Sequence, residues 1–233
     1  MIASNVQIVK SEIEDICNNC GRKFDEITII AVSKTKPLDA IKEAYKAGIT
    51  DFGENKAQEL RDKSKIIQSD FNWHFVGHLQ TNKVKYVINS AEYIHSVDSV
   101  KLAEEINNKA ISNNKIQKIL IEVNTSGEDS KFGIRDFESA SQIIDACSKL
   151  ENIRIKGLMT MAPFTDDEKI IRTCFSRLRE MKEKLNIINN QIIELSMGMT
   201  NDYKIAIEEG STILRIGTAI FGQRDSSKGW RGI

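Results

Sequence analysis

The feature that most constrains the fold is an alternation of short apolar runs with amphipathic helical patterns, which repeats along the chain from residue 27 onward. The predicted strands are rich in apolar and β-branched residues and cover 27–33, 50–53, 73–77, 93–97, 117–123, 153–159, 192–197 and 213–217. The predicted helices centre on 38–47, 55–67, 80–89, 99–112, 136–149, 167–187 and 202–209. Strands joined by helices need crossover connections, so the sheet is expected to be parallel.

Eight strands and their helices within 233 residues are what an α/β fold of the (β/α)8 TIM-barrel type requires. An open doubly wound sheet is the alternative, and it usually has a glycine-rich loop after the first strand. Here that position holds Ser33-Lys34-Thr35-Lys36-Pro37, without glycine. No linker or shift in composition divides the chain. We therefore expect a single domain over 1–233, with an extra N-terminal helix within 1–21 and a loose polar tail at 225–233.

Charge and composition exclude several classes of function. The 33 basic residues balance the 33 acidic ones, so no overall field favours nucleic acid or a membrane surface. Lys63 and Lys65, with Arg61 and Asp62, are expected to form a mixed-charge helix face rather than a nucleic-acid patch. No apolar stretch reaches the ~20 residues that span a bilayer, and no signal peptide is apparent, which predicts a cytoplasmic protein. No symmetric interface can be read from the sequence, which leaves a monomer as the expectation.

The four cysteines do not indicate a metal site. Cys17 and Cys20 form a CxxC pair, but no second pair and no histidine cluster completes a zinc set. We therefore expect structural thiols and no bound metal.

The first apolar run ends on a lysine, Lys34, at the carboxyl end of the first predicted strand. In a parallel barrel the chemistry gathers at this end of the strands. An amine that leaves an apolar interior is poorly solvated as a cation, which lowers its pKa and makes it a nucleophile able to form a Schiff base. The alternative is a strand-end lysine that bends out to solvent.

Two late segments have the composition of a phosphate site. Ser196–Thr200 follow the seventh predicted strand, and Arg215–Thr218 close the eighth. Phosphate sites in barrels often use the loops after these two strands, where glycines, hydroxyls and backbone N–H groups supply the contacts. Together the two segments favour a phosphate-binding site.

Arg215 interrupts the eighth apolar run, and strand alternation places it on the inward face. A buried guanidinium must be paired or bound to a ligand. Either it holds a ligand, or it forms a salt bridge to Glu54 or Glu122. A lysine, phosphate loops and this arginine together suggest a phosphorylated aldehyde held as an imine, for which pyridoxal 5′-phosphate (PLP) is suited. A class I aldolase barrel is the rival, although its lysine usually comes from a late strand.

Five sets of residues carry a resemblance to a known family: Ala31–Pro37, Phe52–Asn55, Trp73–Gln80, Gly157–Met161, and Ser196–Asp202 with Gly210–Thr218. They resemble signatures of the pyridoxal phosphate homeostasis protein family, relatives of the N-terminal barrel of alanine racemases. They occur in order from the first strand to about Arg224, so the resemblance covers nearly the whole chain and implies an alanine-racemase-like barrel that binds PLP.

The resemblance also implies roles for individual residues. Lys34 matches the lysine that forms the internal aldimine, and Lys36 matches a second lysine that stays outside it. Arg215 matches the arginine that faces the pyridine nitrogen. The other implied cofactor contacts are Asn55 near the ring, Ser196, Gly217 and Thr218 with the Met197 backbone around the phosphate, and, on rim segments, His78 and Met159. Thr200 stands where the family usually has serine.

The family role that this implies is a PLP-binding protein that buffers the cofactor or delivers it to PLP-dependent apo-enzymes. Alanine racemase needs a second base, a tyrosine from a separate β-domain, and this chain ends at Ile233 shortly after the eighth strand. Without an opposed acid and base, robust catalysis is not expected. An amino-acid racemase is the alternative, and a sugar-phosphate aldolase is a third hypothesis.

Overall fold

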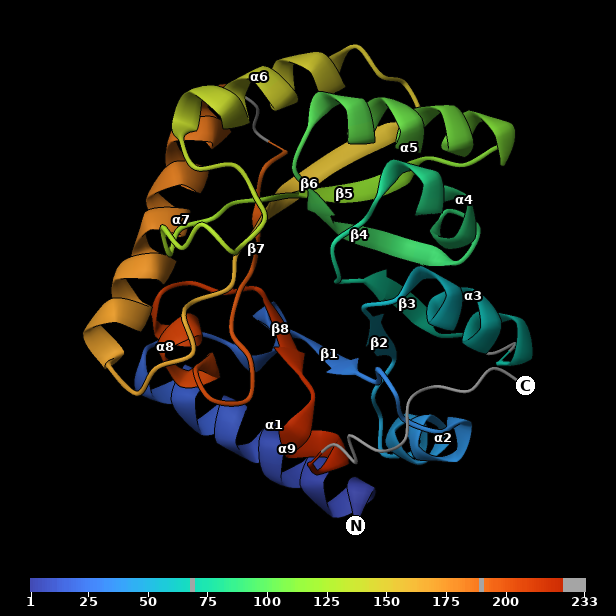
Figure 1. Cartoon of the computed structure of the whole chain (residues 1–233). Helices are drawn as coiled ribbons and strands as arrows, with labels where there is room; N and C mark the ends of the chain where they lie inside the picture. Colours follow the sequence, from blue (N-terminus) through green and yellow to red (C-terminus); the bar gives the residue numbers. More distant parts are fainter. Residues whose placement is uncertain (68–69, 189–190, 224–233) are drawn as a thin grey trace.

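The strands form a closed parallel barrel in a computed structural model that describes residues 1–67, 70–188 and 191–223. Each strand lies beside its neighbour in sequence, and β8 returns to pair with β1 (Figure 1). The strands are β1 Thr28–Val32, β2 Asp51–Glu54, β3 Asn72–Phe75, β4 Ala91–Val97, β5 Gln117–Glu122, β6 Ile153–Met159, β7 Glu194–Ser196 and β8 Ile213–Ile216. The prediction of a (β/α)8 barrel is confirmed, and every strand boundary lies within two residues of its expected place.

Helices surround the barrel, as Figure 1 shows. They are α1 Ile2–Asn19, α2 Leu38–Lys46, α3 Ala57–Ile66, α4 Val84–Val87, α5 Val100–Ser112, α6 Phe137–Ser148, α7 Glu168–Ile188, α8 Tyr203–Glu208 and α9 Thr218–Phe221, with 3-10 turns at Phe24–Glu26 and Thr81–Lys83. The extra N-terminal helix α1 packs against α2, α8 and α9. The predicted loose tail at 225–233 lies outside the described residues.

Helix α7 illustrates why these segments are helical. Ile171, Cys174, Phe175 and Leu178 are buried at a spacing of three and four residues, so they form one apolar stripe. Such stripes build the larger core, which lies between the helices and the strands. Across residues 1–67, 70–188 and 191–223, no helix combines the length and apolar character that a membrane crossing requires.

The inside of the barrel has a different composition from the outer core. A small apolar cluster of Ile30, Leu120, Met159 and Ile213 occupies part of it. Buried polar side chains of the strands include His74, His95, Glu122, Ser196 and Arg215. Buried polar groups cost free energy unless they are hydrogen-bonded, so the interior must hold a connected polar network.

Strands β6 and β7 approach each other closely at Gly157, which pairs with Glu194. A Cβ at Gly157 would lie 1.9 Å from the carbonyl oxygen of Glu194. This oxygen belongs to the backbone, so the strands would have to separate. We expect Gly157→Ala to lower the free energy of unfolding by about 3 kcal/mol in urea denaturation. Lys156→Ala on the same strand is the control, and equal stability of the two variants would contradict the close approach.

Candidate functional site

A cavity of about 390 Å³ opens at the carboxyl ends of the strands. Its walls come from the segments that follow β1, β2, β3, β5, β6, β7 and β8, together with strand residues at the ends of β1 and β5 and within β8. The structure brings together six of the nine predicted cofactor contacts there, namely Lys34, Asn55, His78, Arg215, Gly217 and Thr218. Residues that are far apart in sequence therefore share one site, at the end of the barrel where such folds place their chemistry.

The other three predicted contacts, Ser196, Met197 and Met159, do not line this cavity. Met159 is buried in the apolar cluster inside the barrel, and Met197 is buried in the outer core. Ser196 is buried beneath Arg215. Side chains within a strand point alternately into the barrel and towards the helices, so residues beyond the strand end are better placed to reach its mouth. The loop after β7 contributes 199–202 instead.

Lys34 lies in a tight turn directly after β1. Its neighbour Thr35 has φ of 65°, a left-handed conformation that is rare for a β-branched residue. The Lys36 N–H donates to the Ser33 carbonyl oxygen at 3.0 Å, and the Thr35 N–H donates to Glu59 Oε1 at 2.6 Å. Backbone strain of this kind persists where the surroundings impose it, and it is enriched at functional sites.

A buried cluster of charged side chains is hydrogen-bonded to this turn. Lys63 Nζ donates to the Ser33 carbonyl oxygen at 2.8 Å, to Glu54 Oε1 at 2.8 Å and to Glu59 Oε1 at 2.7 Å. The three charged side chains are all buried. The two lysines therefore do not share the expected mixed-charge face, because α3 turns Lys63 towards β2, whereas Lys65 is exposed. We call Lys63, Glu54 and Glu59 the α3 cluster.

The Lys36 ammonium forms its hydrogen bonds outside the cavity. Its Nζ donates to the carbonyl oxygens of Phe221 at 3.0 Å, Gly222 at 3.2 Å and Gln223 at 3.2 Å. These carbonyls belong to the end of α9 and the residues after it. Lys36 does not line the cavity, so Lys34 is the lysine of this turn that does.

Arg215 is a buried cation at the cavity. Its Nη1 donates to the carbonyl oxygen and to Oγ of Ser196, both at 2.7 Å, and its Nη2 donates to the Thr160 carbonyl oxygen at 2.8 Å. Within the described residues no carboxylate lies within 4.0 Å of it, so a direct salt bridge to Glu54 or Glu122 is not formed. Burial lowers the pKa of Arg215 to about 10, which still leaves it charged at neutral pH.

Glu122 is a buried carboxyl at the cavity wall. Its Oε2 has no hydrogen-bond partner among the described residues. Burial, reinforced by the charge of Asp98 and opposed by Arg215, raises the pKa of Glu122 from 4.5 to about 7. The group therefore binds a proton more tightly in the folded protein than in the unfolded chain.

The raised pKa of Glu122 determines the direction in which its contribution to stability changes with pH. Because the folded pKa of Glu122 is raised, its contribution to stability is largest below pH 4.5 and falls as pH rises to 7. We expect Glu122→Gln to gain stability relative to the wild type between pH 5 and pH 8, by on the order of 2 kcal/mol. Thermal unfolding at constant ionic strength measures both proteins. Parallel pH curves for the two would show that Glu122 has an ordinary pKa.

Aromatic rings form one side of the cavity mouth. His78 stacks on Phe132 with ring centroids 3.6 Å apart and an angle of 12° between the planes. Phe132 and Phe164 both line the cavity and are 52% and 93% exposed. The mouth therefore offers flat apolar surface as well as charge, a combination that suits a planar aromatic ligand with an ionic group.

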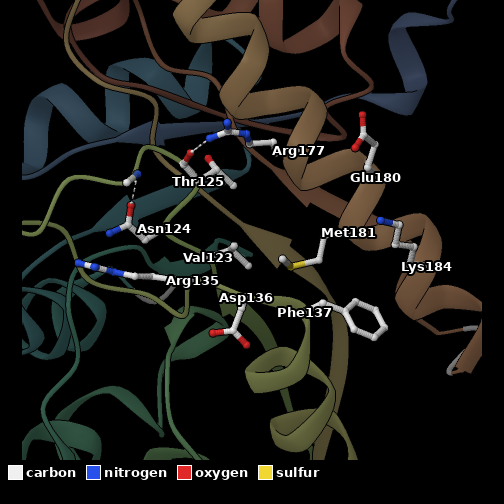
Figure 2. A pocket seen from close by; sticks show the side chains of 11 residues that line it. Val123, Asn124, Thr125, Arg135, Asp136, Phe137, Arg177, Glu180, Met181 and Lys184 are labelled. Atoms are coloured by element: carbon white, nitrogen blue, oxygen red, sulfur yellow. Dashed lines mark hydrogen bonds between the residues drawn. The ribbon is translucent and has the colours of Figure 1, made fainter.

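A second cavity, of about 370 Å³, lies on the outside of the barrel (Figure 2). Figure 2 shows Arg177 and Met181 of α7 on one side of it, with Asp136 and Phe137 at the start of α6 on the other. Arg177 Nη1 donates to the Thr125 carbonyl oxygen at 3.3 Å. None of the predicted contacts lines this cavity, so the barrel mouth is the candidate site.

The fold and the site define a class of protein, the barrels built like the N-terminal domain of alanine racemase. The family model described as "Alanine racemase, N-terminal domain" matches residues 6–225. A pyridoxal phosphate homeostasis protein of Aquifex aeolicus is 40% identical over 218 residues, which cover 93% of this chain and 95% of that relative. The chain belongs to the pyridoxal phosphate homeostasis protein family.

Solved structures are also similar over nearly the whole chain. A protein of Bifidobacterium adolescentis described as unknown is 35% identical, with a TM-score of 0.87 and coverage of 94% of each chain. PipY of Synechococcus elongatus, solved with PLP bound, is 31% identical, with a TM-score of 0.84. The alignment covers 95% of this chain and 100% of PipY.

Proposed function

We propose that this protein binds PLP and maintains its supply in the cell. The observation that carries the proposal is the presence of Lys34 and Arg215 in one cavity at the barrel mouth. A lysine amine can bind the cofactor's aldehyde carbon covalently, and a fixed cation stabilises its anionic or electron-rich groups. The names of the relatives and the cofactor in PipY support the same ligand.

The residues at the mouth fit PLP in chemistry and in size. Lys34 would bind the aldehyde carbon, and Arg215 and Asn55 would contact the ring. Gly217 and Thr218, at the start of α9, together with Thr200 of the preceding loop, would hold the phosphate. Their hydroxyl and backbone N–H groups are donors suited to an anion. When bound, PLP supplies an aldehyde that condenses with amines and a ring that withdraws electrons.

The charge on Arg215 would limit how strongly the bound cofactor withdraws electrons. A guanidinium that stays protonated does not donate a full proton to the ring nitrogen, so the ring withdraws electrons less strongly. An amino-acid racemase is the alternative function, and besides Lys34 the lining groups that could move a proton include His78, Glu122 and Asp202. Exchange of the alanine Cα proton in deuterated water at an enzymatic rate, lost in Lys34→Ala, would support it.

The first experiment is the visible spectrum of the purified protein before and after borohydride reduction, followed by peptide mass mapping. A yellow band that reduction abolishes, with a pyridoxyl group on Lys34, would establish the cofactor and its anchor. A protein that stays colourless and unmodified with added PLP would overturn the proposal. A reduced substrate carbon chain on the lysine, without pyridoxyl, would indicate a sugar-phosphate aldolase.

We further propose that the protein is a cytoplasmic monomer that releases PLP to apo-enzymes. The exposed Phe132 and Phe164 at the mouth support release, because they leave the cavity accessible from outside. Reactivation of an apo-aminotransferase by the loaded protein measures transfer, and sedimentation measures the oligomeric state. If PLP reaches the apo-enzyme no faster than it dissociates into buffer, the role of the protein would be limited to storage.

A further inference from the structure

A chain of hydrogen bonds runs through the barrel interior from Arg215 to the opposite end of the barrel. Arg215 Nη1 donates to Ser196 Oγ at 2.7 Å, and Ser196 Oγ lies 2.9 Å from His95 Nδ1. His95 Nε2 lies 3.0 Å from His74 Nδ1, and His74 Nε2 lies 2.9 Å from Asp51 Oδ1. Asp51 begins β2, whereas the cavity lies beyond the end of that strand. We call these five side chains the core relay.

The contacts of Ser196 assign a direction to the relay. Its Oγ accepts a hydrogen bond from Arg215, so its own hydroxyl hydrogen needs a different acceptor. Among the described residues, His95 Nδ1 is the one acceptor within hydrogen-bond distance of that hydroxyl. His95 must then carry its proton on Nε2 and donate it to His74 Nδ1. His74 in turn carries its proton on Nε2 and donates it to Asp51.

The ends of the relay carry the charges that this direction requires. Asp51 also accepts from Thr50 Oγ1 at 2.7 Å, so it has two donors for a carboxylate. Although burial opposes it, the bonds from His74 and Thr50 lower the pKa of Asp51. Burial, reinforced by the nearby charge of Arg215, lowers the pKa of His95 well below its ordinary value, which keeps that ring neutral. A cation and an anion are thus joined through neutral groups whose protons all point towards Asp51.

We propose that Ser196, His95, His74 and Asp51 are positioning residues for Arg215, which hold its guanidinium in a fixed orientation towards the ligand in the cavity. Among the described residues, Glu122 and Asp202 of the cavity wall act on the charge of Arg215 from a distance, but no carboxylate forms an ion pair with it. The relay connects its guanidinium through hydrogen bonds to a further carboxylate, Asp51, at the far end of the barrel. Hydrogen bonds in such a chain polarise one another, so a change at Asp51 reaches Arg215. The proposal rests on the proposed function, because it assigns the ligand-facing group of that same site.

The first test reads the proton positions directly and does not depend on PLP. The chain has three histidines, so long-range ¹⁵N–¹H spectra of histidine-labelled protein contain few signals. His78 is exposed and is assigned by its loss in His78→Gln. We expect the two remaining rings to be neutral and protonated on Nε2 at neutral pH, with and without PLP. A ring protonated on Nδ1, or an imidazolium, would overturn the direction of the relay.

The second test changes the distant end of the relay. Asp51→Asn keeps the size of the side chain and removes the charge far from the cavity. We expect PLP to bind about tenfold more weakly, the scale at which outer partners affect the ligands they orient. We also expect the visible band of the bound cofactor to shift, because the orientation of Arg215 changes. Ser196→Ala breaks the relay at its other end and should shift the band in the same direction.

Tyr93→Phe is the matched control for these variants. Tyr93 stacks on His74 with centroids 5.2 Å apart and donates to Glu194 at 2.7 Å, but it is not part of the relay. Its phenylalanine variant disturbs the same part of the barrel, and we expect an unchanged band and affinity. Binding of PLP by Asp51→Asn as tight as by the wild type, with the same band, would overturn the positioning role. Failure of the wild type to bind PLP would instead overturn the proposed function, while the histidine signals still decide the relay.

Discussion

Replacement of Lys34 by alanine is expected to abolish the covalent retention of PLP. Lys34 is the lysine of the β1 turn that lines the cavity, and an imine cannot form without its amine. After incubation with PLP and reduction by borohydride, we expect no pyridoxyl peptide from this turn and no residual yellow colour after desalting. The loss is complete because a methyl group offers no nucleophile, whereas weak binding through the phosphate contacts can remain.

Lys36→Ala is the control for this experiment, because Lys36 lies in the same turn but binds the carbonyls at the end of α9. We expect it to keep the reducible band and the adduct on Lys34. Recovery of a full pyridoxyl adduct at another position in Lys34→Ala would disprove the assignment of the anchor.

The second large effect that we expect is a loss of stability when Lys63 is replaced by methionine. The replacement removes the ammonium of the α3 cluster and leaves Glu54 and Glu59 buried without it. Breaking a buried ion pair in this way costs about 3–5 kcal/mol. For a domain of this size, that loss lowers the midpoint of thermal unfolding by roughly 10 °C. We also expect weaker PLP binding, because Lys63 and Glu59 hold the turn that carries Lys34.

Lys65→Met on the same helix is the matched control, since Lys65 is exposed and its replacement should change stability by less than about 0.5 kcal/mol. Glu59→Gln added to Lys63→Met should restore part of the loss, because it removes one of the two uncompensated charges. Equal melting temperatures for the two single lysine variants would mean that the cluster is not ionised as described.

The sequence was sufficient to predict the fold because the barrel depends on a repeated local pattern. Each strand has its own apolar run and each helix its own stripe, so the boundaries in β5 and β6 could be read to within a residue. Lys34 and Arg215 could be predicted for the same reason. A charged residue at the end of such a run, or within it, conflicts with local pattern, and such conflicts tend to mark functional sites.

The relay and the α3 cluster could not be predicted in this way. Their contacts join residues of different strands and helices, and helical spacing alone does not show that α3 turns Lys63 inward. The sequence contained one signal for the relay. Strand alternation in β4 places His95 on the same face of the strand as Tyr93. The contact of Ser196 with Arg215 could not be predicted either, since it depends on the neighbouring strand.

The pairing of β1 with β8 has a consequence for how the site is made. Ile30 of β1 is in register with Arg215 of β8, so the first and last strands of the barrel meet next to the cavity that Arg215 lines. Contacts of such long sequence separation form late and slowly, because a long loop must close first. A chain emerging from the ribosome therefore has Lys34 long before it has Arg215. A ligand that contacts both Lys34 and Arg215 would therefore bind only the closed barrel, and it would stabilise that state by mass action.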